Sequence, residues 1–369
     1  MRLLICAGMT GDGMYPALAV LQALANKTSK VLWVGSESKM EQELLKPYNL
    51  EFEAVPAAGL HGVGLWTFPG NFSQLLRGWR KAKSVIREFQ PDVMFFTGGY
   101  LGVPVAMAGR QVPSVVFVPD IEPGIALKAI IRFSEIVAAV TEKTAKYIKN
   151  IPVEKSGYPI RKELKEWTKQ KARKHFGITE NDKTLLVYGG SKGARSINQA
   201  LLKILPDLLK EMHVIHITGM DHFNSVLEAT EKLPSGLKNH YHIYSFLHEE
   251  MGAAFATADL VVCRAGASTL GELPYFGLPA ILVPYPYAWR YQHKNAEFLR
   301  EKGCAVILED QMLEQELPGK IKSLINNPDT LQKMSDAMKE ISKPDAADRI
   351  AEMILQAGNR SAVKEDFNG

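Results

Sequence analysis

Short apolar runs alternate with longer amphipathic stretches along the whole chain. The apolar runs of the first half are RLLICAG, KVLWVG, DVMFFTGG, SVVFVPD and EIVAAVT, and those of the second half are TLLVYGG, HVIHITG, HYHIYSF, LVVCRAG, PAILVPY and CAVILED. Most are continuously apolar and rich in β-branched or aromatic residues, as strands buried on both faces must be. Helical patterns fall between them, for example over 16–25 and 72–89. The alternation predicts an α/β fold with parallel sheets covered by helices on both faces.

The two halves open in the same way, with a strand, a glycine-containing loop and a helix. The first loop reads GMTGDG over 8–13, and the second reads GGSKG over 189–193. The repetition predicts two doubly wound, Rossmann-like domains that face each other across a cleft, residues 1–160 and 161–344. The charged stretch 161–183 suits the connection. A periodic helix over 345–356 can pack back on the first domain, and the polar tail 357–369 is expected to be disordered.

Composition narrows the class of protein. The 369 residues suit two domains, and 46% hydrophobic with 23% charged residues fits a globular chain. The net charge of +4 is too small to indicate a nucleic acid partner. No apolar run approaches the ~20 residues that cross a bilayer, and the N-terminal run meets Asp12 too early for a signal peptide. Cys6, Cys263 and Cys304 show no metal-ligand spacing. Cys6 and Cys263 lie inside apolar runs, so we expect these two to be buried thiols, which fits a reducing cytoplasm.

Each glycine loop is a candidate phosphate site. Residues 189–195 offer backbone N–H groups at a helix N-terminus, which attract phosphate, and Ser191 adds a hydroxyl. A plain tight turn is the alternative, and the loop is not a G-x-x-x-x-G-K-[ST] motif. Residues 8–13 match a dinucleotide fingerprint only loosely, with Glu37 near the place of the ribose-binding acid. The alternative there is a loop that lets a ligand approach its backbone closely.

Two further segments follow strands of the second half. Residues 263–272, CRAGASTLGE, carry Ser268 and Thr269, whose hydroxyls can hold a diphosphate, and Glu272, whose carboxylate can accept two hydrogen bonds from a ribose diol. The alternative is helix capping, with Ser268 as N-cap and Glu272 favoured by the helix dipole. The strand PAILVPY is followed by a polar cluster that suits sugar hydroxyls: Arg290, Gln292 and Asn295.

Six motifs follow one another along the chain: GMTGDGMYPALAV, GGYLGVP, GYPIR, GGSKGAR, VVCRAGASTLGELPYFGLPAILVP and Q-x-x-N-A. In this order they resemble the motifs of the MurG-type N-acetylglucosaminyltransferases of peptidoglycan synthesis. The resemblance covers nearly the whole chain, and its second-half motifs are the specific part. It implies the two-domain GT-B fold with a metal-free active site and no cofactor. It also implies an inverting transfer of N-acetylglucosamine from UDP-N-acetylglucosamine to a muramyl-pentapeptide diphosphoryl polyprenol (lipid I). The product would be lipid II, formed at the cytoplasmic face of the cell membrane.

The resemblance also implies residue roles by position. Ser191 meets the diphosphate, Arg161 reaches the donor from the domain junction, and Leu247 lies near the uracil. Gln292 contacts the sugar, with Asn295 beside it. Diphosphate and ribose are held by Ala267, Ser268, Thr269, Leu270, Gly271 and Glu272, with Glu272 on the ribose hydroxyls. The lipid diphosphate and acceptor face Thr10, Gly11, Asp12, Gly98, Gly99 and Tyr100.

Two motifs of the first half depart from the family pattern. The family's first loop usually reads G-G-T-G-G-H, whereas Met9, Asp12 and Gly13 stand here and the histidine is absent. A family H-E-Q-N run is replaced by VPDIEPG over 118–124. The nucleotide half is intact and supports a UDP-sugar, so these departures leave the sugar, the acceptor and the catalytic base open.

An inverting transfer needs a base for the acceptor hydroxyl. The carboxylates left for this role are Asp120, Asp12 and Glu122. We favour Asp120, because a carboxylate at a helix N-terminus, as expected for Asp12, has a lowered pKa and is a weaker base. The alternative for Asp120 and Glu122 is that they only shape a proline-rich turn.

Residues 60–90 combine apolar and basic side chains in a way that suits the anionic inner leaflet of a membrane. The apolar members are Leu60, Val63, Leu65, Trp66, Phe68, Leu75, Leu76 and Trp79, and the basic members are Arg77, Arg80, Lys81, Lys83 and Arg87. A second patch contains Leu127, Lys128, Ile130, Ile131, Arg132 and Phe133. An ordinary amphipathic helix docked on the sheet is the alternative.

Three other functions stay open. The altered first half is compatible with a related UDP-sugar transferase that acts on diacylglycerol or another polyprenol. A UDP-sugar epimerase has a related fold but needs no lipid. A homologue that binds the nucleotide without a base would have no activity.

Overall fold

The computed structural model describes the chain except for residues 8–10, 26, 37–40, 43–44, 58–67, 288–289 and 367–369, and it describes only the backbone of 12, 68–72 and 361–366. The chain folds into two units. One consists of Met1–Arg161 with Pro344–Gly369, and the other of Lys162–Lys343. Each unit is a parallel sheet with helices packed on it, as the sequence pattern predicts for the fold class.

The sheet of the first unit has, within the described residues, the order β3-β2-β1-β4-β5-β6-β7. Its strands are β1 (Arg2–Cys6), β2 (Lys30–Gly35), β3 (Glu51–Ala54), β4 (Val93–Phe96), β5 (Ser114–Val118), β6 (Ile136–Ala139) and β7 (Val153–Lys155). All the strands predicted for this half are confirmed. The pattern missed β3 and β7 because they are short, carry charged residues and lie at the sheet edges, where no continuous apolar run is needed.

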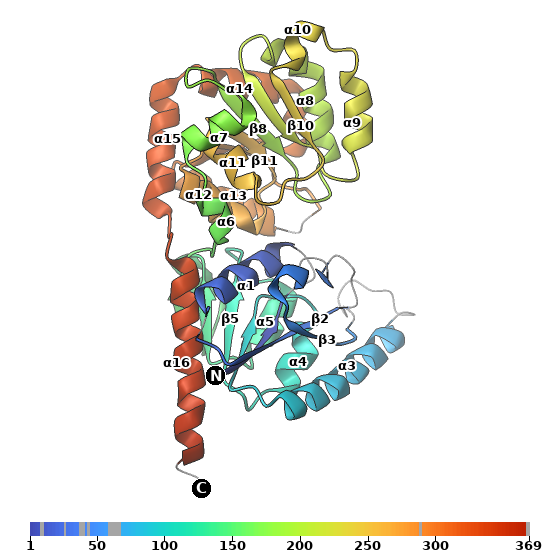
Figure 1. Ribbon diagram of the computed structural model, residues 1–369, viewed down its shortest axis with the longest axis vertical. Coiled ribbons are helices and arrows are strands. Elements are labelled where there is room, and N and C mark those ends of the chain that lie inside the picture. Colours follow the sequence, from blue (N-terminus) through green and yellow to red (C-terminus); the bar gives the residue numbers. More distant parts are fainter. Residues whose placement is uncertain are drawn as a thin grey trace. The chain divides into compact units, whose positions relative to one another are not determined.

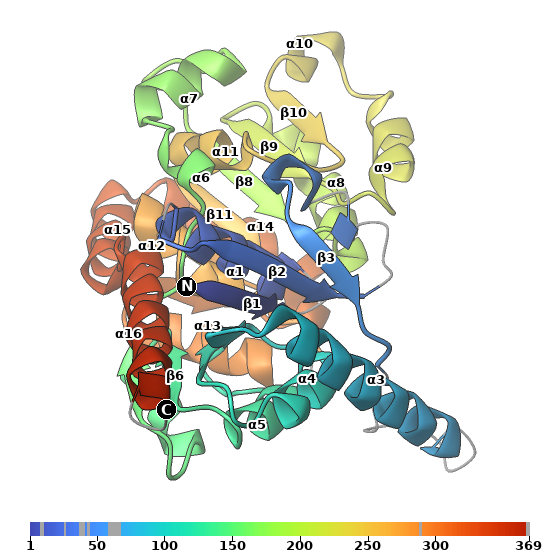
Figure 2. The ribbon, with the colours of Figure 1, turned by 60° about the horizontal axis from the view of Figure 1, so that its bottom comes forward.

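Helices cover both faces of this sheet. They are α1 (Gly11–Ala23), α3 (Phe68–Phe89), α4 (Gly102–Ala108), α5 (Ile125–Ile131) and α16 (Ala346–Asp366), with 3-10 turns η1 (Lys46–Tyr48) and η2 (Glu142–Tyr147). Figure 2 shows α3, α4 and α5 together on one side, where they share a core with Leu4 and Cys6 of β1. In Figure 1, α16 runs beside the same unit, and it contacts α1, β4 and β5. The helix continues to Asp366, so the disorder expected from 357 onwards is not what the structure has up to that residue.

The sheet of the second unit has, in the described chain, the order β10-β9-β8-β11-β12-β13. Its strands are β8 (Thr184–Tyr188), β9 (His213–Ile217), β10 (Tyr241–Tyr244), β11 (Leu260–Cys263), β12 (Ala280–Leu282) and β13 (Ala305–Ile307). Every strand predicted for this half is confirmed. The order is that of a doubly wound dinucleotide-type sheet, whose strand sequence reverses between β8 and β11.

Helices on both faces of the second sheet complete the unit. They are α6 (Lys162–Lys165), α7 (Lys169–Phe176), α8 (Arg195–Leu208), α9 (Phe223–Thr230), α10 (Ser235–Lys238), α11 (Met251–Thr257), α12 (Glu272–Phe276), α13 (Tyr291–Glu301), α14 (Leu313–Ile325) and α15 (Pro328–Ile341), with η3 (Ala267–Leu270) and η4 (Asp310–Met312). On one face α8 and α14 bury apolar stripes, represented by Leu201 and Ile321, against Val187 and Val262. This packing holds the strands in register and fixes where each connecting loop emerges.

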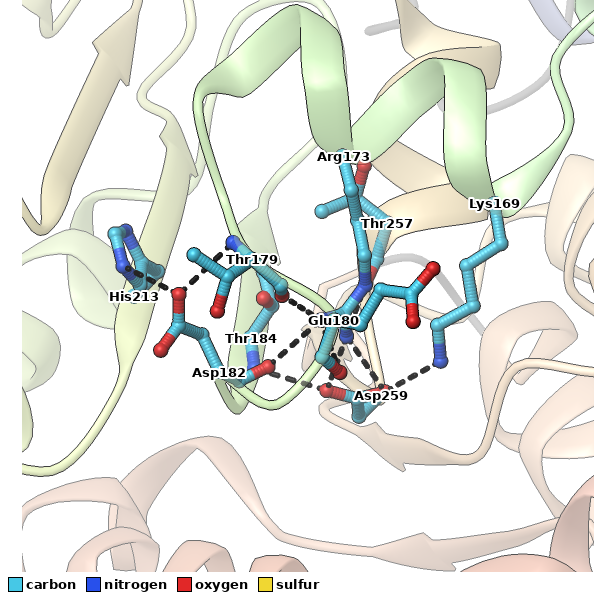
Figure 3. A network of polar contacts seen from close by, with 9 residues as sticks. All are labelled: Lys169, Arg173, Thr179, Glu180, Asp182, Thr184, His213, Thr257 and Asp259. Atoms are coloured by element: carbon cyan, nitrogen blue, oxygen red, sulfur yellow. Dashed lines mark hydrogen bonds and ion pairs between the residues drawn. The ribbon is translucent and has the colours of Figure 1, made fainter.

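The charged stretch 161–183, which we expected to connect the domains, mostly folds as part of the second unit. Its anchor is the buried Arg173 on α7 (Figure 3), whose guanidinium nitrogen lies 3.2 Å from the Asp259 carboxylate. Arg173 also donates to the carbonyls of four residues, Thr179, Glu180, Asp182 and Thr257. The Thr184 N–H and Lys169 Nζ both donate to the Asp259 carboxylate. Because Thr184 begins β8, the network lies at the amino ends of the strands and has a structural role.

The surfaces predicted to face a membrane are only partly exposed. The outer face of α3 exposes Leu76, Arg77, Arg80, Lys83 and Arg87. The part of this segment that contains Leu60, Val63, Leu65 and Trp66 lies outside the described residues. On α5, Leu127, Ile130 and Ile131 are buried in the core, so the prediction that they face a membrane is wrong. Their side chains serve the packing of α5 on the sheet.

Candidate active site

The carboxyl edge of the second sheet is the main candidate site. Strands β8 and β11 are neighbours there, and the chain winds away from them in opposite directions, through β9 and β10 on one side and β12 and β13 on the other. At such a switch point the loops separate and leave a crevice in which ligands bind. Two segments border it: residues 189–193 after β8, termed the glycine loop, and residues 264–271 after β11, termed the serine loop.

The glycine loop is accessible at Gly190, Ser191 and Lys192, which are exposed, while the Gly193 N–H donates to the Gly190 carbonyl at 2.9 Å. Gly190 and Gly193 have φ angles of +94° and +82°, which side chains rarely allow. Helix α8 then starts at Arg195 with Ala194 as N-cap, and alanine has no side-chain oxygen for the first free N–H groups. The first turn of α8 and the exposed Ser191 therefore offer donors to an anion such as a diphosphate.

The serine loop folds into the 3-10 turn η3. Thr269 is buried, and its Oγ1 donates to the Gly266 carbonyl at 2.6 Å, while Ser268 is half-buried. The N-cap of η3 is Gly266 and that of α12 is Gly271, so the alternative in which Ser268 caps a helix is wrong. Glu272 stands in the first turn of α12 with a half-buried side chain. This leaves the binding hypothesis for Ser268 and Glu272 in place.

Arg264, directly after β11, joins several segments around the site, and the sequence analysis assigned it no role. Its guanidinium donates to the Asp310 carboxylate, to Ser196 Oγ at 2.9 Å and to the Val283 carbonyl at 3.3 Å. It also lies 5.2 Å from the centre of the Tyr285 ring. These contacts tie the first turn of α8, the serine loop, the end of β12 and η4 together, which the five donors of an arginine allow. In the sequence, the signal for this role of Arg264 is an arginine that directly follows a buried apolar strand.

The predicted sugar-binding amides differ in their placement. Gln292 Oε1 accepts from the Tyr285 backbone N–H at 2.8 Å, so its NH₂ group is the part that can face a sugar hydroxyl. Asn295 is fully buried, and its Nδ2 donates to the Ala265 carbonyl at 3.1 Å. Asn295 therefore supports the serine loop from within, which does not fit the sugar contact predicted for it. Leu247 is buried just beyond the carboxyl end of β10.

The first unit has corresponding loops at the carboxyl ends of β1 and β4. Gly98 and Gly99 follow β4 with φ angles of +125° and +83°, and the Tyr100 side chain is 42% exposed. Gly11 begins α1 just after β1. The described residues do not include Thr10, Glu37 or the side chain of Asp12. The structure thus brings the described acceptor-side residues to one sheet edge.

The carboxylates after β5 are placed unequally. Glu122 is buried, and its Oε1 lies 3.1 Å from Lys128 Nζ. Asp120 is half-buried and follows β5, which ends at Val118. Of these two carboxylates, that of Asp120 is therefore the more accessible to a ligand.

Arg161 closes the first unit in a partly buried position. Its guanidinium carbon lies 4.1 Å from the centre of the Tyr15 ring, a cation–π contact. Its Nε is buried and has no hydrogen-bond partner among the residues that the structure describes. A buried donor without a partner is rare in proteins, so this nitrogen is a candidate contact for a bound group.

All three cysteines are buried and free, and this confirms the burial predicted for Cys6 and Cys263. Burial raises the pKa of the Cys263 and Cys304 thiols to about 12, so neither is a nucleophile near neutral pH. In the described part of the chain, no three His, Cys, Asp or Glu side chains are grouped so that they could hold a metal ion. No helix within the same residues is long and apolar enough to cross a membrane.

Two doubly wound parallel-sheet units in one chain match the GT-B fold class of nucleotide-sugar enzymes. Within this class the chain belongs to glycosyltransferase family 28. Residues 3–119 match the N-terminal domain of that family, and residues 184–350 match its C-terminal domain. The family resemblance predicted from the sequence motifs is confirmed.

Relatives extend over nearly the whole chain. The chain is 35% identical to a protein of Roseiflexus sp. (strain RS-1), covering 95% of this chain and 94% of that protein. It is 34% identical to one of Thermoanaerobacter sp. (strain X514), covering 96% and 99%. Both carry the name UDP-N-acetylglucosamine--N-acetylmuramyl-(pentapeptide) pyrophosphoryl-undecaprenol N-acetylglucosamine transferase.

Solved structures show the same fold at lower identity. The Acinetobacter baumannii MurG structure is 24% identical with a TM-score of 0.74, covering 96% of this chain and 99% of that one. A UDP-GlcNAc 2-epimerase from Neisseria meningitidis, bound to UDP-GlcNAc, is 15% identical with a TM-score of 0.67, covering 96% and 100%. The fold alone is therefore shared by transferases and epimerases.

Proposed function

We propose that the protein transfers N-acetylglucosamine from UDP-N-acetylglucosamine to undecaprenyl-diphospho-muramoyl-pentapeptide (lipid I), with inversion at the anomeric carbon, to give lipid II. The observation that carries this proposal is the pair of loops at the β8–β11 switch point, in a chain that resembles named N-acetylglucosamine transferases over nearly its full length. Peptidoglycan synthesis is the process in which such a transfer serves.

The donor binds at the carboxyl edge of the second sheet. The N–H groups of the glycine loop and of the first turn of α8 hold the diphosphate, helped by Ser191. Glu272 accepts hydrogen bonds from the ribose hydroxyls, Leu247 contacts the uracil, and the NH₂ of Gln292 contacts the sugar. The rest of the binding segment is Ala267, Ser268, Thr269, Leu270 and Gly271.

The acceptor binds at the carboxyl edge of the first sheet, near the loops that follow β1 and β4. Its diphosphate faces Thr10, Gly11, Asp12, Gly98, Gly99 and Tyr100. The buried Nε of Arg161, which has no partner in the described chain, supports the contact with the donor diphosphate that the family resemblance implies. The lipid part of the acceptor requires a membrane surface, for which the exposed face of α3 is the candidate.

The reaction is a single displacement. The acceptor hydroxyl oxygen attacks C1 of the sugar while the bond from C1 to the diphosphate oxygen breaks, and UDP leaves with the electron pair. Asp120 accepts the hydroxyl proton. Negative charge that develops on the leaving diphosphate is stabilised by the N–H donors of the glycine loop and by Arg161. With these donors in place, we expect neither a metal ion nor another cofactor to be required.

Incubation with labelled UDP-N-acetylglucosamine and lipid I, in EDTA and separately in magnesium, tests the proposal. We expect label in lipid II under both conditions. If activity is lost in EDTA and restored by magnesium or manganese, the reaction depends on a metal ion and this part of the proposal is wrong. Transfer only to diacylglycerol or to another polyprenol indicates a related transferase. Isomerisation of the UDP-sugar without acceptor indicates an epimerase, which the shared fold permits. Binding without turnover indicates a protein that has lost its base.

A further inference from the structure

Two polar side chains lie in the core directly behind the glycine loop. His216 stands between Ile215 and Ile217 on β9 and is fully buried. Asn198, on the buried face of α8, is 2% exposed. Burying polar groups is unfavourable unless each is hydrogen-bonded, so a satisfied pair in an apolar core fixes one arrangement of its neighbours. A histidine inside an apolar strand was the sequence signal for this pair.

Their hydrogen bonds can run in one direction only. Asn198 Nδ2 donates to the Thr218 carbonyl at 2.9 Å, because a carbonyl can only accept. Asn198 Oδ1 lies 3.0 Å from His216 Nε2 and must accept, so Nε2 carries the ring proton. The neutral ring then uses Nδ1 to accept from the Tyr241 hydroxyl at 2.8 Å. Burial lowers the pKa of His216 to about 3, which keeps the ring neutral near pH 7.

The Thr218 carbonyl, where this series ends, supports the glycine loop. A Cβ on Gly193 would overlap the Thr218 carbonyl oxygen, and a Cβ on Gly219 would overlap the backbone of Gly193. The Met220 N–H donates to the Ser191 carbonyl at 3.3 Å. The end of β9 is therefore in direct backbone contact with the glycine loop, and a shift of Thr218 must shift the loop.

We propose that His216 and Asn198 are positioning residues for the diphosphate. The series of hydrogen bonds from Tyr241 through His216 and Asn198 to the Thr218 carbonyl, termed the relay, holds the end of β9 in place. The N–H donors of the glycine loop then keep the spacing that a diphosphate needs. His216 is buried and acts through Asn198 and Thr218, without touching a ligand. The inference rests on the proposed role of the glycine loop, and displacements of about 1 Å at such a site can cost ~100-fold in rate.

The variants His216→Met and His216→Gln test the relay. The two side chains have similar shape, but only glutamine has an amide N–H that can donate to Asn198 Oδ1. Affinities for UDP and for uridine are measured by calorimetry or competition. We expect His216→Met to weaken UDP binding roughly tenfold, as one lost buried hydrogen bond implies, and to leave uridine binding unchanged. We expect His216→Gln to keep most of the wild-type affinity for UDP. Unchanged UDP affinity in His216→Met, or an equal loss for UDP and uridine, overturns the proposal.

His213→Met is the matched control, since His213 lies on the same strand at its amino end, and we expect it to leave the ratio of the two affinities unchanged. A changed ratio there contradicts the relay. If His216→Met does not fold, Asn198→Asp takes its place, because it keeps the shape but puts an acceptor against the Thr218 carbonyl. Gly193→Ala separates the hypothesis that the glycine loop binds the diphosphate from the hypothesis that the relay positions this loop. If it weakens UDP binding and His216→Met does not, only the relay fails. If Gly193→Ala leaves UDP binding intact, the diphosphate site itself is wrong, and the relay falls with it.

Discussion

Burial separates two kinds of polar side chain around the carboxyl edge of the second sheet. Ser191 is exposed, and Ser268 and Glu272 are half-buried, so a ligand can reach them. Asn198 and Asn295 are buried and bond to backbone carbonyls. Residue type does not distinguish these groups, because an amide suits both a sugar hydroxyl and a buried carbonyl. For this reason the sequence predicts which loops form the site more reliably than which side chains contact the ligand.

Glu272 provides a direct test of the donor site. In the proposed donor site the Glu272 carboxylate accepts two hydrogen bonds from the ribose hydroxyls, so Glu272→Ala should weaken the binding of UDP by roughly 2–3 kcal/mol. Glu272→Gln keeps the shape and one acceptor oxygen and should lose less. Isothermal titration of UDP measures both, and undiminished UDP affinity in the alanine variant would remove Glu272 from the donor site.

Asp120 is the candidate base. Asp120→Asn keeps the shape but cannot accept a proton, so turnover should fall roughly 10²–10⁴-fold while the affinity for UDP stays close to that of the wild type. Glu122→Gln is the matched variant in the same loop. Since Glu122 is buried against Lys128, we expect it to reduce stability more than turnover.

The kinetics of lipid II formation distinguish the carboxylates. If Asp120→Asn keeps wild-type turnover while Asp12→Asn or Glu122→Gln abolishes it, the role of base moves to that residue. If all three variants stay active, catalysis does not depend on a carboxylate base, and orientation with leaving-group stabilisation must account for the rate.

At the scale of elements, the strands β9 and β10 carry histidines whose burial links stability to pH. Burial lowers the pKa of His216 to about 3 and, with the charges of His213 and His240, that of His242 to about 4. In an unfolded chain a histidine titrates near 6.5. Between the folded and unfolded pKa values the unfolded state binds more protons than the folded state. The contribution of each histidine to the free energy of unfolding is therefore complete above about pH 7 and is lost as the pH falls.

We therefore expect the free energy of unfolding of the second unit to decrease below about pH 6.5 by about 1.4 kcal/mol per pH unit for each of the two histidines. His242→Gln should reduce this slope by about 1.4 kcal/mol per pH unit between pH 6 and pH 5, which corresponds to one proton. The exposed His248 offers the matched control, His248→Gln. Denaturant titrations at several pH values measure the slopes, and equal slopes for His242→Gln and the wild type contradict the linkage.

The elements also show what a single sequence can and cannot predict. Buried central strands such as β1 and β8 are continuous apolar runs, so their positions followed from the pattern. The edge strands β3 and β7 carry charges because one side of each is unpaired, and the pattern missed them. On α5 the same apolar residues could have faced a membrane or the sheet. Only packing resolves that choice, since Leu127 and Ile130 are buried.

At the scale of the whole molecule, the two units share a topology but differ in how closely they follow the family motifs. The second unit keeps its nucleotide motifs, whereas the first carries the altered residues 9–13 and 118–124. Both named relatives carry a lipid-linked acceptor in their names, and the first unit of this chain carries the exposed basic face of α3. The departures and the candidate membrane surface thus lie in the same unit, so acceptor specificity is the property to test there.

Binding to lipid vesicles tests the α3 surface. Its exposed side chains include Leu76, Arg80 and Lys83, whereas Lys81 on the same helix is 2.7 Å from Glu53 and thus partly neutralised. We expect binding to vesicles that contain phosphatidylglycerol, and much weaker binding to phosphatidylcholine alone. Each basic residue near an anionic surface contributes about 1 kcal/mol. The double variant Arg80→Gln/Lys83→Gln should therefore weaken binding roughly thirtyfold at low salt, and less at high salt.

The control for that experiment removes the same charge elsewhere. Lys232 and Lys238 are exposed on the second unit, so Lys232→Gln/Lys238→Gln has the same net charge as the α3 variant but an intact α3. At about 0.1 M salt we expect this control to bind vesicles within about twofold of the wild type, because attraction to a surface then falls off within a Debye length of ~10 Å. Equal losses in the two double variants mean that net charge alone governs binding. Undiminished binding in the α3 variant means that another surface faces the lipid, and the acceptor must then reach the first unit by a different side.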